Sequence, residues 1–327
     1  VTGAAGFIGS HLCEKLLGLG ANVIAIDNFS TGSESNIVHM YTNKRFKFFQ
    51  LDANSMTDME TAFNSKIDFV FHYAAILGVQ RVEEDPLSVL KDINGIENIC
   101  VLSKKHNVKK LIYASSSEAY GDIAEIPLVE DNLSINKHSN HSHIYALVKL
   151  IGERIISTYY QQHHLSACSL RFFNVYGPNE YHKEKMQSVI INSFMQCKNE
   201  GIVKLFKSYK KNIEHGHQKR DFIYVKDCVS VILWILDNSS ISGIFNCGTG
   251  QARSFKDLAM AMYSSINKQP SIKYIEMPKN LKEQYQYFTE AKMDKIIEAG
   301  YNKKFIKLED GIEDYVQNYL SNKRTYR

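Results

Sequence analysis

Gly3-Ala-Ala-Gly6-Phe-Ile-Gly9 stands between the end of an apolar segment and a helix-length stretch over 7–19. Glycine is needed where a backbone turns tightly against a ligand, and a helix that begins there points its N–H groups at a phosphate. The spacing differs from G-x-G-x-x-G, so an ordinary strand-to-helix turn is the alternative interpretation. We expect these glycines, with Phe7 and Ile8, to bind the pyrophosphate of a dinucleotide. Because the sequence opens inside the motif, we also expect native residues of a first strand before Val1.

Short apolar runs alternate with helix-length stretches through the first half of the chain, which is typical of a parallel α/β sheet. Buried strands are predicted at 22–27, 46–51, 67–72, 110–115 and 167–172, and crossover helices at 7–19, 86–105 and 144–164. The predicted fold class is therefore α/β, a Rossmann-type doubly wound parallel sheet.

The pattern loosens after residue 174 into shorter helices near 186–199, 254–267 and 309–320 and a strand near 271–277. We predict an NAD-binding Rossmann domain over 1–173 and a smaller α/β substrate-binding lobe over 174–327. Segments near 221–250 have strand character again, so we expect the chain to return to the first domain there.

Composition excludes several classes of protein. The 327 residues include 39 Lys and Arg against 35 Asp and Glu, a formal charge of +4, which is too small to indicate a nucleic-acid partner. No run approaches the ~18 apolar residues of a membrane span. The six cysteines form no C-x-x-C pair, which argues against zinc ribbons and disulfide frameworks. We expect a cytoplasmic protein with reduced thiols and no membrane partner.

Three further positions fit a dinucleotide. Asp27 closes a strand 18 positions after Gly9, where a carboxylate accepts hydrogen bonds from the adenosine ribose and repels a 2′-phosphate. This favours NAD over NADP. Asp52 follows the next strand and is placed to meet the adenine, with a helix N-cap as its alternative role. Ala74 and Ala75 supply small side chains where the cofactor passes.

Tyr145-Ala-Leu-Val-Lys149 opens a helix, and the i,i+4 spacing places phenol and ammonium on one face. Lys149 would lower the pKa of Tyr145 by its charge and make the phenol a usable base. Ser116 lies at the end of a strand, at the sheet edge where open α/β folds bind ligands. Y-x-x-x-K alone is common, and packing would also explain it.

The chain resembles the extended short-chain dehydrogenase/reductase family, which remodels nucleoside diphosphate sugars. The motifs that carry the resemblance are Gly3-x-x-Gly6-x-x-Gly9, Asp27-Asn28, His72-Tyr-Ala-Ala75, Asn94, Tyr113-Ala-Ser-Ser-Ser-Glu-Ala-Tyr-Gly121, Tyr145-x-x-x-Lys149 and Arg171-Phe-Phe-Asn-Val-Tyr-Gly-Pro178. The resemblance implies that Asn28 and Asn94 also bind NAD. It further implies that Lys149 holds the nicotinamide ribose, Ser116 binds the reacting oxygen and Tyr145 moves its proton, giving a transient keto sugar. A homodimer or higher oligomer through 86–105 and 144–164 is implied as well.

The second half resembles the ADP-glycero-manno-heptose 6-epimerases in particular. That resemblance implies a second acid/base at Lys183, facing the sugar opposite Tyr145, and substrate contacts from Asn174, Val175, Arg220 and Tyr285. It also implies a place in lipopolysaccharide or capsule biosynthesis. The alternative for Lys183 is an exposed loop lysine, and Glu34 replaces a lysine of the heptose enzymes, which again points to NAD.

Glu118 departs from the heptose enzymes, which carry a small residue there, and matches a glutamate of sugar-nucleotide dehydratases and decarboxylases. A carboxylate beside a 4-keto sugar could remove the C5 proton. We therefore predict an NAD-dependent nucleotide-sugar epimerase, with a 4,6-dehydratase or decarboxylase using Glu118 as the alternative. A non-catalytic NAD-binding regulator is the alternative of another class. His138, His141 and His143 have a metal-like spacing in a polar stretch, and we expect no metal.

Overall fold

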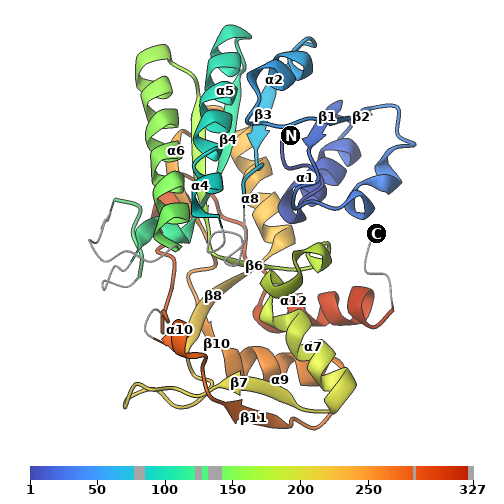
Figure 1. Cartoon of the computed structure of the whole chain (residues 1–327), viewed down its shortest axis with the longest axis vertical. Coiled ribbons are helices and arrows are strands. Elements are labelled where there is room, and N and C mark those ends of the chain that lie inside the picture. Colours follow the sequence, from blue (N-terminus) through green and yellow to red (C-terminus); the bar gives the residue numbers. More distant parts are fainter. Residues whose placement is uncertain (77–84, 122–126, 132–141, 283–284, 323–327) are drawn as a thin grey trace.

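The computed structural model describes residues 1–76, 85–121, 127–131, 142–282 and 285–322. Two lobes are stacked along the long axis of the molecule (Figure 1). The upper lobe holds the parallel sheet and its long helices, and the lower lobe holds two small sheets with shorter helices. The mixed α/β architecture agrees with the predicted fold class.

The main sheet is parallel, and the N-terminal residues join its two groups of strands. Thr2 forms bridges with both Ile26 and His72, so the first residues lie between two strand pairs. The strands follow the order β2, β1, Thr2, β3, β4, β5, β9. Their bounds are β1 (Val23–Asp27), β2 (Phe46–Gln50), β3 (Phe69–His72), β4 (Lys110–Ser116), β5 (Ala167–Phe172) and β9 (Gly243–Cys247).

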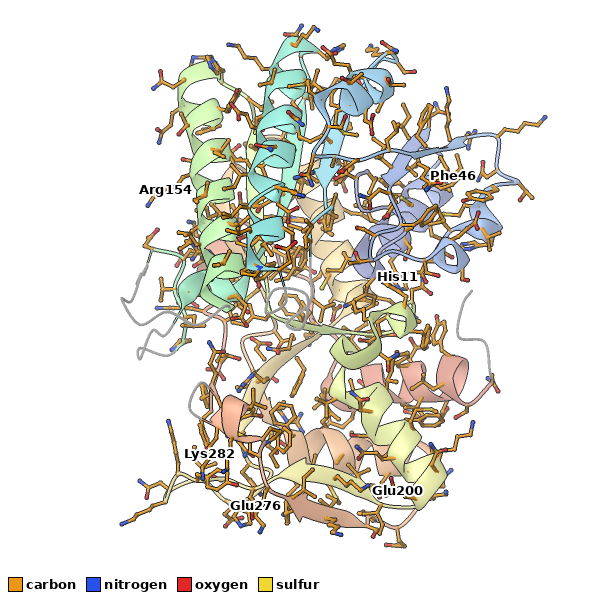
Figure 2. All side chains as sticks on the ribbon, viewed as in Figure 1. His11, Phe46, Arg154, Glu200, Glu276 and Lys282 are labelled. Atoms are coloured by element: carbon orange, nitrogen blue, oxygen red, sulfur yellow. The ribbon has the colours of Figure 1, made fainter. Side chains whose placement is uncertain are left out.

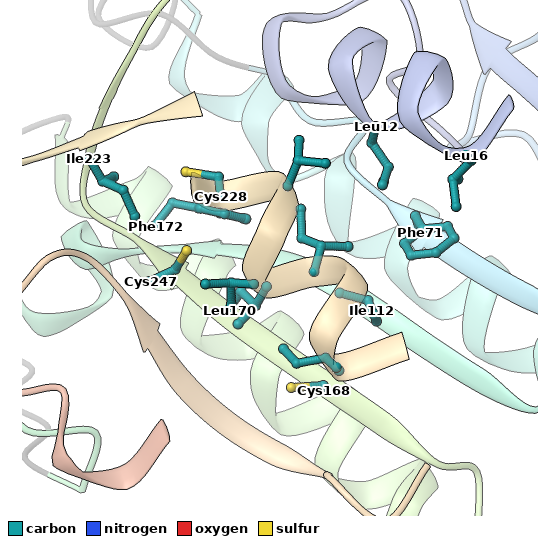
Figure 3. Close-up of a cluster of buried hydrophobic side chains, with 14 of the residues drawn as sticks. Leu12, Leu16, Phe71, Ile112, Cys168, Leu170, Phe172, Ile223, Cys228 and Cys247 are labelled. Atoms are coloured by element: carbon teal, nitrogen blue, oxygen red, sulfur yellow. The ribbon is translucent and has the colours of Figure 1, made fainter. Parts of the chain in front are cut away.

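Helices cover both faces of this sheet. One face carries α1 (Phe7–Gly18) and α8 (Val225–Asp237), and the other carries α2 (Met56–Ala62), α5 (Asp92–Lys105) and α6 (Ser142–His163). Figure 3 shows Leu12 and Leu16 of α1 and Cys228 of α8 facing apolar side chains of the sheet strands. This burial orients the strand ends that form the site.

The predicted helix over 86–105 is interrupted. Pro86–Val89 forms a short α4, capped by the Asp85 side chain, before α5 begins at Asp92. The N–H groups of Ile93 and Asn94 bond to carbonyls three residues back, at Leu90 and Lys91, so the backbone tightens at this point.

The lower lobe has its own core. A three-stranded sheet contains β6 (Asn174–Tyr176), β8 (Lys219–Tyr224) and β10 (Ala252–Ser254), and a two-stranded sheet contains β7 (Val203–Phe206) and β11 (Ile272–Ile275). The longer helices are α7 (Val189–Glu200), α9 (Phe255–Ser265) and α12 (Leu308–Tyr315), which continues as a π-helix over Val316–Leu320. The shorter ones are α10 (Lys279–Lys282) and α11 (Asp294–Glu298), with 3₁₀ turns η1 (Glu34–Asn36), η2 (Val38–Met40), η3 (Ser117–Tyr120) and η4 (Tyr181–Met186).

The expected return of the chain to the first domain occurs in part. β9 pairs with β5, and α8 packs on α1, so 225–247 lies with the upper sheet. β8 does not join that sheet, because it pairs with β6 and β10 instead. Ile223 of β8 nevertheless packs into the core beneath α8.

Within the described ranges, every helix is too short or too polar to cross a bilayer. All six cysteines are buried with free thiols.

Candidate active site

The glycine-rich turn, Gly3–Gly9, is set by close backbone contacts. Gly3 has φ +69°, and a Cβ there would lie 2.6 Å from the Ala74 nitrogen. A Cβ at Gly9 would overlap the Gly3 carbonyl oxygen. Only glycine fits these two positions, because side chains would collide with backbone atoms.

Gly6 is the N-cap of α1, and it offers no capping side chain. The first turn of α1 also carries no acidic residue. The N–H groups of Phe7 and Ile8 are therefore free of a competing side-chain carboxylate, at the positive end of the helix dipole. The turn fits a pyrophosphate, as the sequence predicts.

Asp27 is held rigidly at the end of β1. Its two carboxylate oxygens accept hydrogen bonds from Ala5 N and Phe29 N, each at 2.9 Å. Burial raises the pKa of this carboxyl, and the two backbone hydrogen bonds oppose the rise. Gly32 lies so close that a Cβ there would come within 2.9 Å of both oxygens. Asn28 is exposed, and its Oδ1 accepts from Ser30 N at 2.9 Å.

Asp27→Asn should weaken the discrimination against NADP. The amide keeps an oxygen for one backbone N–H but loses the charge that repels a 2′-phosphate. We expect the ratio of NADP to NAD dissociation constants to fall by roughly tenfold, about 1.4 kcal/mol. Titration of the two cofactors by calorimetry measures the ratio, and an unchanged ratio would contradict the assignment.

Asp52 follows β2, and its Oδ1 accepts from Asn54 N at 2.9 Å. Its alternative role as a helix cap is not found, because Ser55 caps α2 by accepting from Asp58 N. Ala74 N contacts Thr2 Oγ1 at 3.2 Å, so the segment with Ala74 and Ala75 is held against the glycine-rich turn.

Asn94 is not brought to the site. It is exposed on α5, whereas Asp92, two residues earlier and on another face of the helix, is buried. Asp92 Oδ2 accepts from Ile76 N at 2.7 Å, and its charge raises the pKa of Lys149. The structure thus brings Asp92, and not Asn94, close to Lys149.

Tyr145, Lys149 and Ser116 meet where β4 ends beside α6. The Lys149 ammonium donates to the Ala114 carbonyl at 2.8 Å and lies 5.5 Å from the centroid of the Tyr145 ring. The Ser116 hydroxyl hydrogen-bonds with Tyr145, and it also accepts from Glu118 N at 3.2 Å. The predicted catalytic group is therefore assembled.

The electrostatics differ from the expectation for Tyr145. Burial raises the pKa of its phenol, and the lowering contribution comes from Ser116, whereas none comes from Lys149. Lys149 is itself buried, which lowers its pKa to about 8, with Asp92 and Glu153 opposing. Because the pKa of Lys149 lies well below that of Tyr145, the lysine has lost its charge before the phenol ionises.

The Lys149 pKa leads to a pH prediction. The charged ammonium donates a much stronger hydrogen bond to a ribose hydroxyl than the neutral amine does, and the charge is lost as the pH rises through about 8. We expect the NAD dissociation constant to rise by up to about tenfold per pH unit above that value. Fluorescence titration from neutral to alkaline pH measures it. Lys149→Met should remove the dependence, and a persistent slope in that variant would assign it to another group.

Glu118 lies in η3, near a candidate residue of each lobe, Tyr145 and Arg220. It is exposed, and its charge raises the pKa of both Tyr145 and Arg220. The Arg220 guanidinium lies 5.2 Å from the centroid of Tyr285, and burial lowers its pKa. Asn174 Nδ2 lies 3.5 Å from the Asp221 carbonyl oxygen in the adjacent strand.

Lys183 lies against the glycine-rich turn. Its ammonium is 4.1 Å from the centroid of Phe7, and burial lowers its pKa while Glu180 raises it. The side chain is half-buried, so the alternative of an exposed loop lysine is wrong. Val175 is half-buried on β6 and packs against the cores of both lobes.

Two lysines of the basic stretch from Lys204 to Arg220 form ion pairs within the lower lobe. Lys204 pairs with Glu200 and Lys207 pairs with Glu276, each at 2.6 Å. Figure 2 labels both glutamates on this lobe. Arg220 is the member of the stretch that the structure places beside Tyr285 and Glu118.

The histidine stretch at which we expect no metal lies partly outside the described residues. His138 and His141 lie outside the described residues, and His143 belongs to the first turn of α6. Elsewhere in the described chain, no three His, Cys, Asp or Glu side chains gather as a metal site would need.

Two buried residues near the site, Glu153 and Asn36, belong to no sequence motif that would have singled them out. Glu153 follows Lys149 by one helical turn, but its partners Ser115 and Arg171 come from two strands. Asn36 lies in a polar loop after β1. Both become visible only through contacts distant in sequence.

Comparison with known proteins places this geometry in a family. The model of the NAD dependent epimerase/dehydratase family matches residues 1–248. The ADP-L-glycero-D-manno-heptose-6-epimerase of Nitratidesulfovibrio vulgaris (strain DP4) is 37% identical over 325 residues, covering 98% of this chain and 97% of that protein. The similarity to this relative therefore extends over nearly the whole of both chains.

Two solved structures share the fold. The Helicobacter pylori ADP-L-glycero-D-manno-heptose-6-epimerase has TM-score 0.82 at 26% identity, covering 97% of this chain and 94% of that one. The Thermus thermophilus UDP-glucose 4-epimerase, solved with NAD, has TM-score 0.77 at 27% identity and 96% coverage of both. The prediction of an NAD-dependent nucleotide-sugar epimerase is confirmed, and the chain belongs to the NAD-dependent epimerase/dehydratase family.

Proposed function

We propose that this enzyme inverts one stereocentre of an ADP-glycero-manno-heptose, at the carbon that bears the C6 hydroxyl. The observation that carries the proposal is the presence of two separate acid/base candidates, Tyr145 from α6 beside Ser116 and Lys183 from η4 over Phe7 of the glycine-rich turn. Two such groups suit an epimerase that returns hydride to the opposite face of a carbonyl, because each can serve one face. The full-length heptose epimerase relatives supply the substrate to test first.

Each catalytic residue has one task in this proposal. Tyr145 takes the proton of the substrate hydroxyl, and the Ser116 hydroxyl hydrogen-bonds the same oxygen. Bound NAD supplies the reversible hydride acceptor. Lys149 holds the nicotinamide ribose, and Lys183 exchanges a proton with the keto oxygen from the other side. Arg220 contacts the diphosphate, for which its forked donors are suited, and Tyr285 packs beside it.

The remaining cofactor contacts follow the fold. Asp27 and Asn28 face the adenosine ribose, Asp52 faces the adenine, and Gly3, Gly6, Phe7, Ile8 and Gly9 hold the pyrophosphate. Ala74 and Ala75 leave space for the ring system, and Asn174 with Val175 lies along the sugar.

Glu118 supports a second candidate, a nucleotide-sugar 4,6-dehydratase. Its charge acts on both Tyr145 and Arg220, so the carboxylate lies near the proposed catalytic tyrosine and the proposed diphosphate-binding arginine. From there it could remove a proton next to the keto carbon, and water would leave.

Product mass separates these functions. The enzyme is incubated with NAD and ADP-heptose, UDP-N-acetylglucosamine, UDP-glucose or UDP-glucuronate, and products are analysed by mass spectrometry and sugar NMR. An epimer of unchanged mass supports the proposal. Loss of water would identify a dehydratase, and loss of carbon dioxide would identify a decarboxylase. Intact NAD binding without any turnover would identify a non-catalytic regulator. Glu118→Gln should retain epimerisation and would abolish dehydration.

We further propose that two copies associate through α5 and α6, as a homodimer in the cytoplasm. A groove of about 580 Å³ along these helices is lined by Leu147, Ile151 and Ile155 among others. Leu147 is 39% exposed there, and Leu87 on α4 is 70% exposed, so this face is apolar and uncovered. Sedimentation analysis of the unaltered chain and of Leu147→Glu tests it. The variant should shift to monomer, and an unaltered chain that is already monomeric would contradict the dimer.

A further inference from the structure

One buried amide connects the glycine-rich turn with the segment that precedes Lys183. Asn36 ends η1 and is 1% exposed. Its Nδ2 lies 2.9 Å from the Ala5 carbonyl oxygen, 3.2 Å from the Asn179 carbonyl oxygen and 3.3 Å from His182 Nδ1. A single side chain therefore contacts the cofactor turn and two residues of the lower lobe.

The charge state of His182 suits this contact. Burial lowers the pKa of its imidazole to about 4, and the charge of Lys183 acts in the same direction. Near neutral pH the ring is therefore uncharged, and Nδ1 is able to accept a proton from the Asn36 amide.

The same segment is attached to α1 at two further points. Asn179 has φ +69° and its Nδ2 donates to Ser10 Oγ at 3.1 Å. His11 Nε2 hydrogen-bonds the Pro178 carbonyl oxygen at 2.9 Å, and Figure 2 labels His11 where α1 approaches the lower lobe. The backbone entering η4 is thus held against the upper lobe by α1 as well as by Asn36.

Lys183 follows directly, with its ammonium over Phe7 of the same turn. We propose that Asn36 is a positioning residue for Lys183, which it places by holding Asn179 and His182 against Ala5. The Oδ1 atom of Asn36 is buried without a hydrogen bond among the described residues, which costs stability. The amide nitrogen has two hydrogens, so one bonds the Ala5 carbonyl and the other is shared between the Asn179 carbonyl and His182 Nδ1. The proposal rests on the acid/base role of Lys183.

A double-mutant cycle tests it in the intact enzyme. Asn36→Ala is expected to lower the epimerisation turnover by roughly tenfold to a hundredfold, since a displaced acid/base group reacts slowly. Transient reduction of bound nicotinamide by substrate should persist, because Tyr145, Lys149 and Ser116 are unchanged. In a Lys183→Ala background, Asn36→Ala should have no further effect. Val38→Thr, an exposed change two residues away, serves as the control.

Asn36→Asp covers the case in which the alanine variant fails to fold. The carboxylate faces the unprotonated His182 Nδ1, so turnover of the variant should fall at neutral pH. The ratio of variant to unaltered turnover should recover at acidic pH, where His182 or the new carboxyl group becomes protonated. Lys183 and Glu180, the neighbouring charged groups, are present in both proteins and cancel in that ratio. A ratio that is flat with pH would contradict the contact.

The outcomes separate the two proposals. Full turnover in Lys183→Ala would overturn the two-group mechanism and the positioning role with it. Slow turnover in Lys183→Ala together with multiplying losses in the double variant would overturn the positioning role alone, because Asn36 would then act independently of Lys183.

Discussion

Tyr145→Phe should lower turnover by roughly a thousandfold while leaving NAD binding intact. In the proposed mechanism the phenol moves the substrate proton, and acid/base catalysis of this kind contributes about 10²–10⁴. The ring remains to pack beside Lys149, whose ammonium lies 5.5 Å from its centroid. Steady-state turnover and NAD titration measure the two effects separately.

Tyr160→Phe is the matched control for this substitution. It removes the same hydroxyl from an exposed position on the same helix, α6. We expect normal turnover in the control. Equal activity in the Tyr145 and Tyr160 variants would remove Tyr145 from the mechanism, whichever sugar the enzyme uses.

Glu153→Gln should lower the free energy of unfolding by about 3–5 kcal/mol, the cost of leaving a buried charge uncompensated. Glu153 Oε1 accepts from Ser115 Oγ at 2.5 Å and from Arg171 Nε at 2.8 Å, and Oε2 accepts from Arg171 Nη2 at 2.8 Å. Side-chain exposure is 2% for Glu153 and 0% for Arg171. Urea denaturation measures the loss.

Asp68→Asn provides the comparison at the surface. Asp68 pairs with Lys109 at 2.9 Å, but their side chains are 42% and 65% exposed. Water replaces a lost partner there, so we expect no measurable change in the unfolding midpoint. Similar losses in the two variants would show that the buried pair contributes no more than a surface pair. Because Ser115 adjoins Ser116, turnover of Glu153→Gln should fall as well.

The sequence was informative where local geometry determines the outcome. A Cβ at Gly9 would overlap the Gly3 carbonyl, so the glycine spacing itself reports a tight turn. Tyr145 and Lys149 share a helix face whatever surrounds them, because i,i+4 spacing is a property of the helix. The strands and the cofactor were predictable for the same reason.

The surroundings of individual side chains were harder to predict from the sequence. Asn94 and Asp92 are two residues apart on one helix, and only packing against β3 and the residues after it decides which is buried. The pKa of Tyr145 depends on burial and on Ser116, which comes from another element. Neither follows from the spacing of the motif.

The sequence alone determined a dinucleotide-binding α/β fold that uses NAD, and the shared helix face of Tyr145 and Lys149, since each depends on residues close along the chain. Only the tertiary structure decided that Lys183 lies over Phe7, that Asn36 connects the two lobes, and that β8 leaves the main sheet. The first two depend on contacts between segments more than a hundred residues apart. Such contacts are selected by the burial of both lobes' cores, which no short pattern encodes.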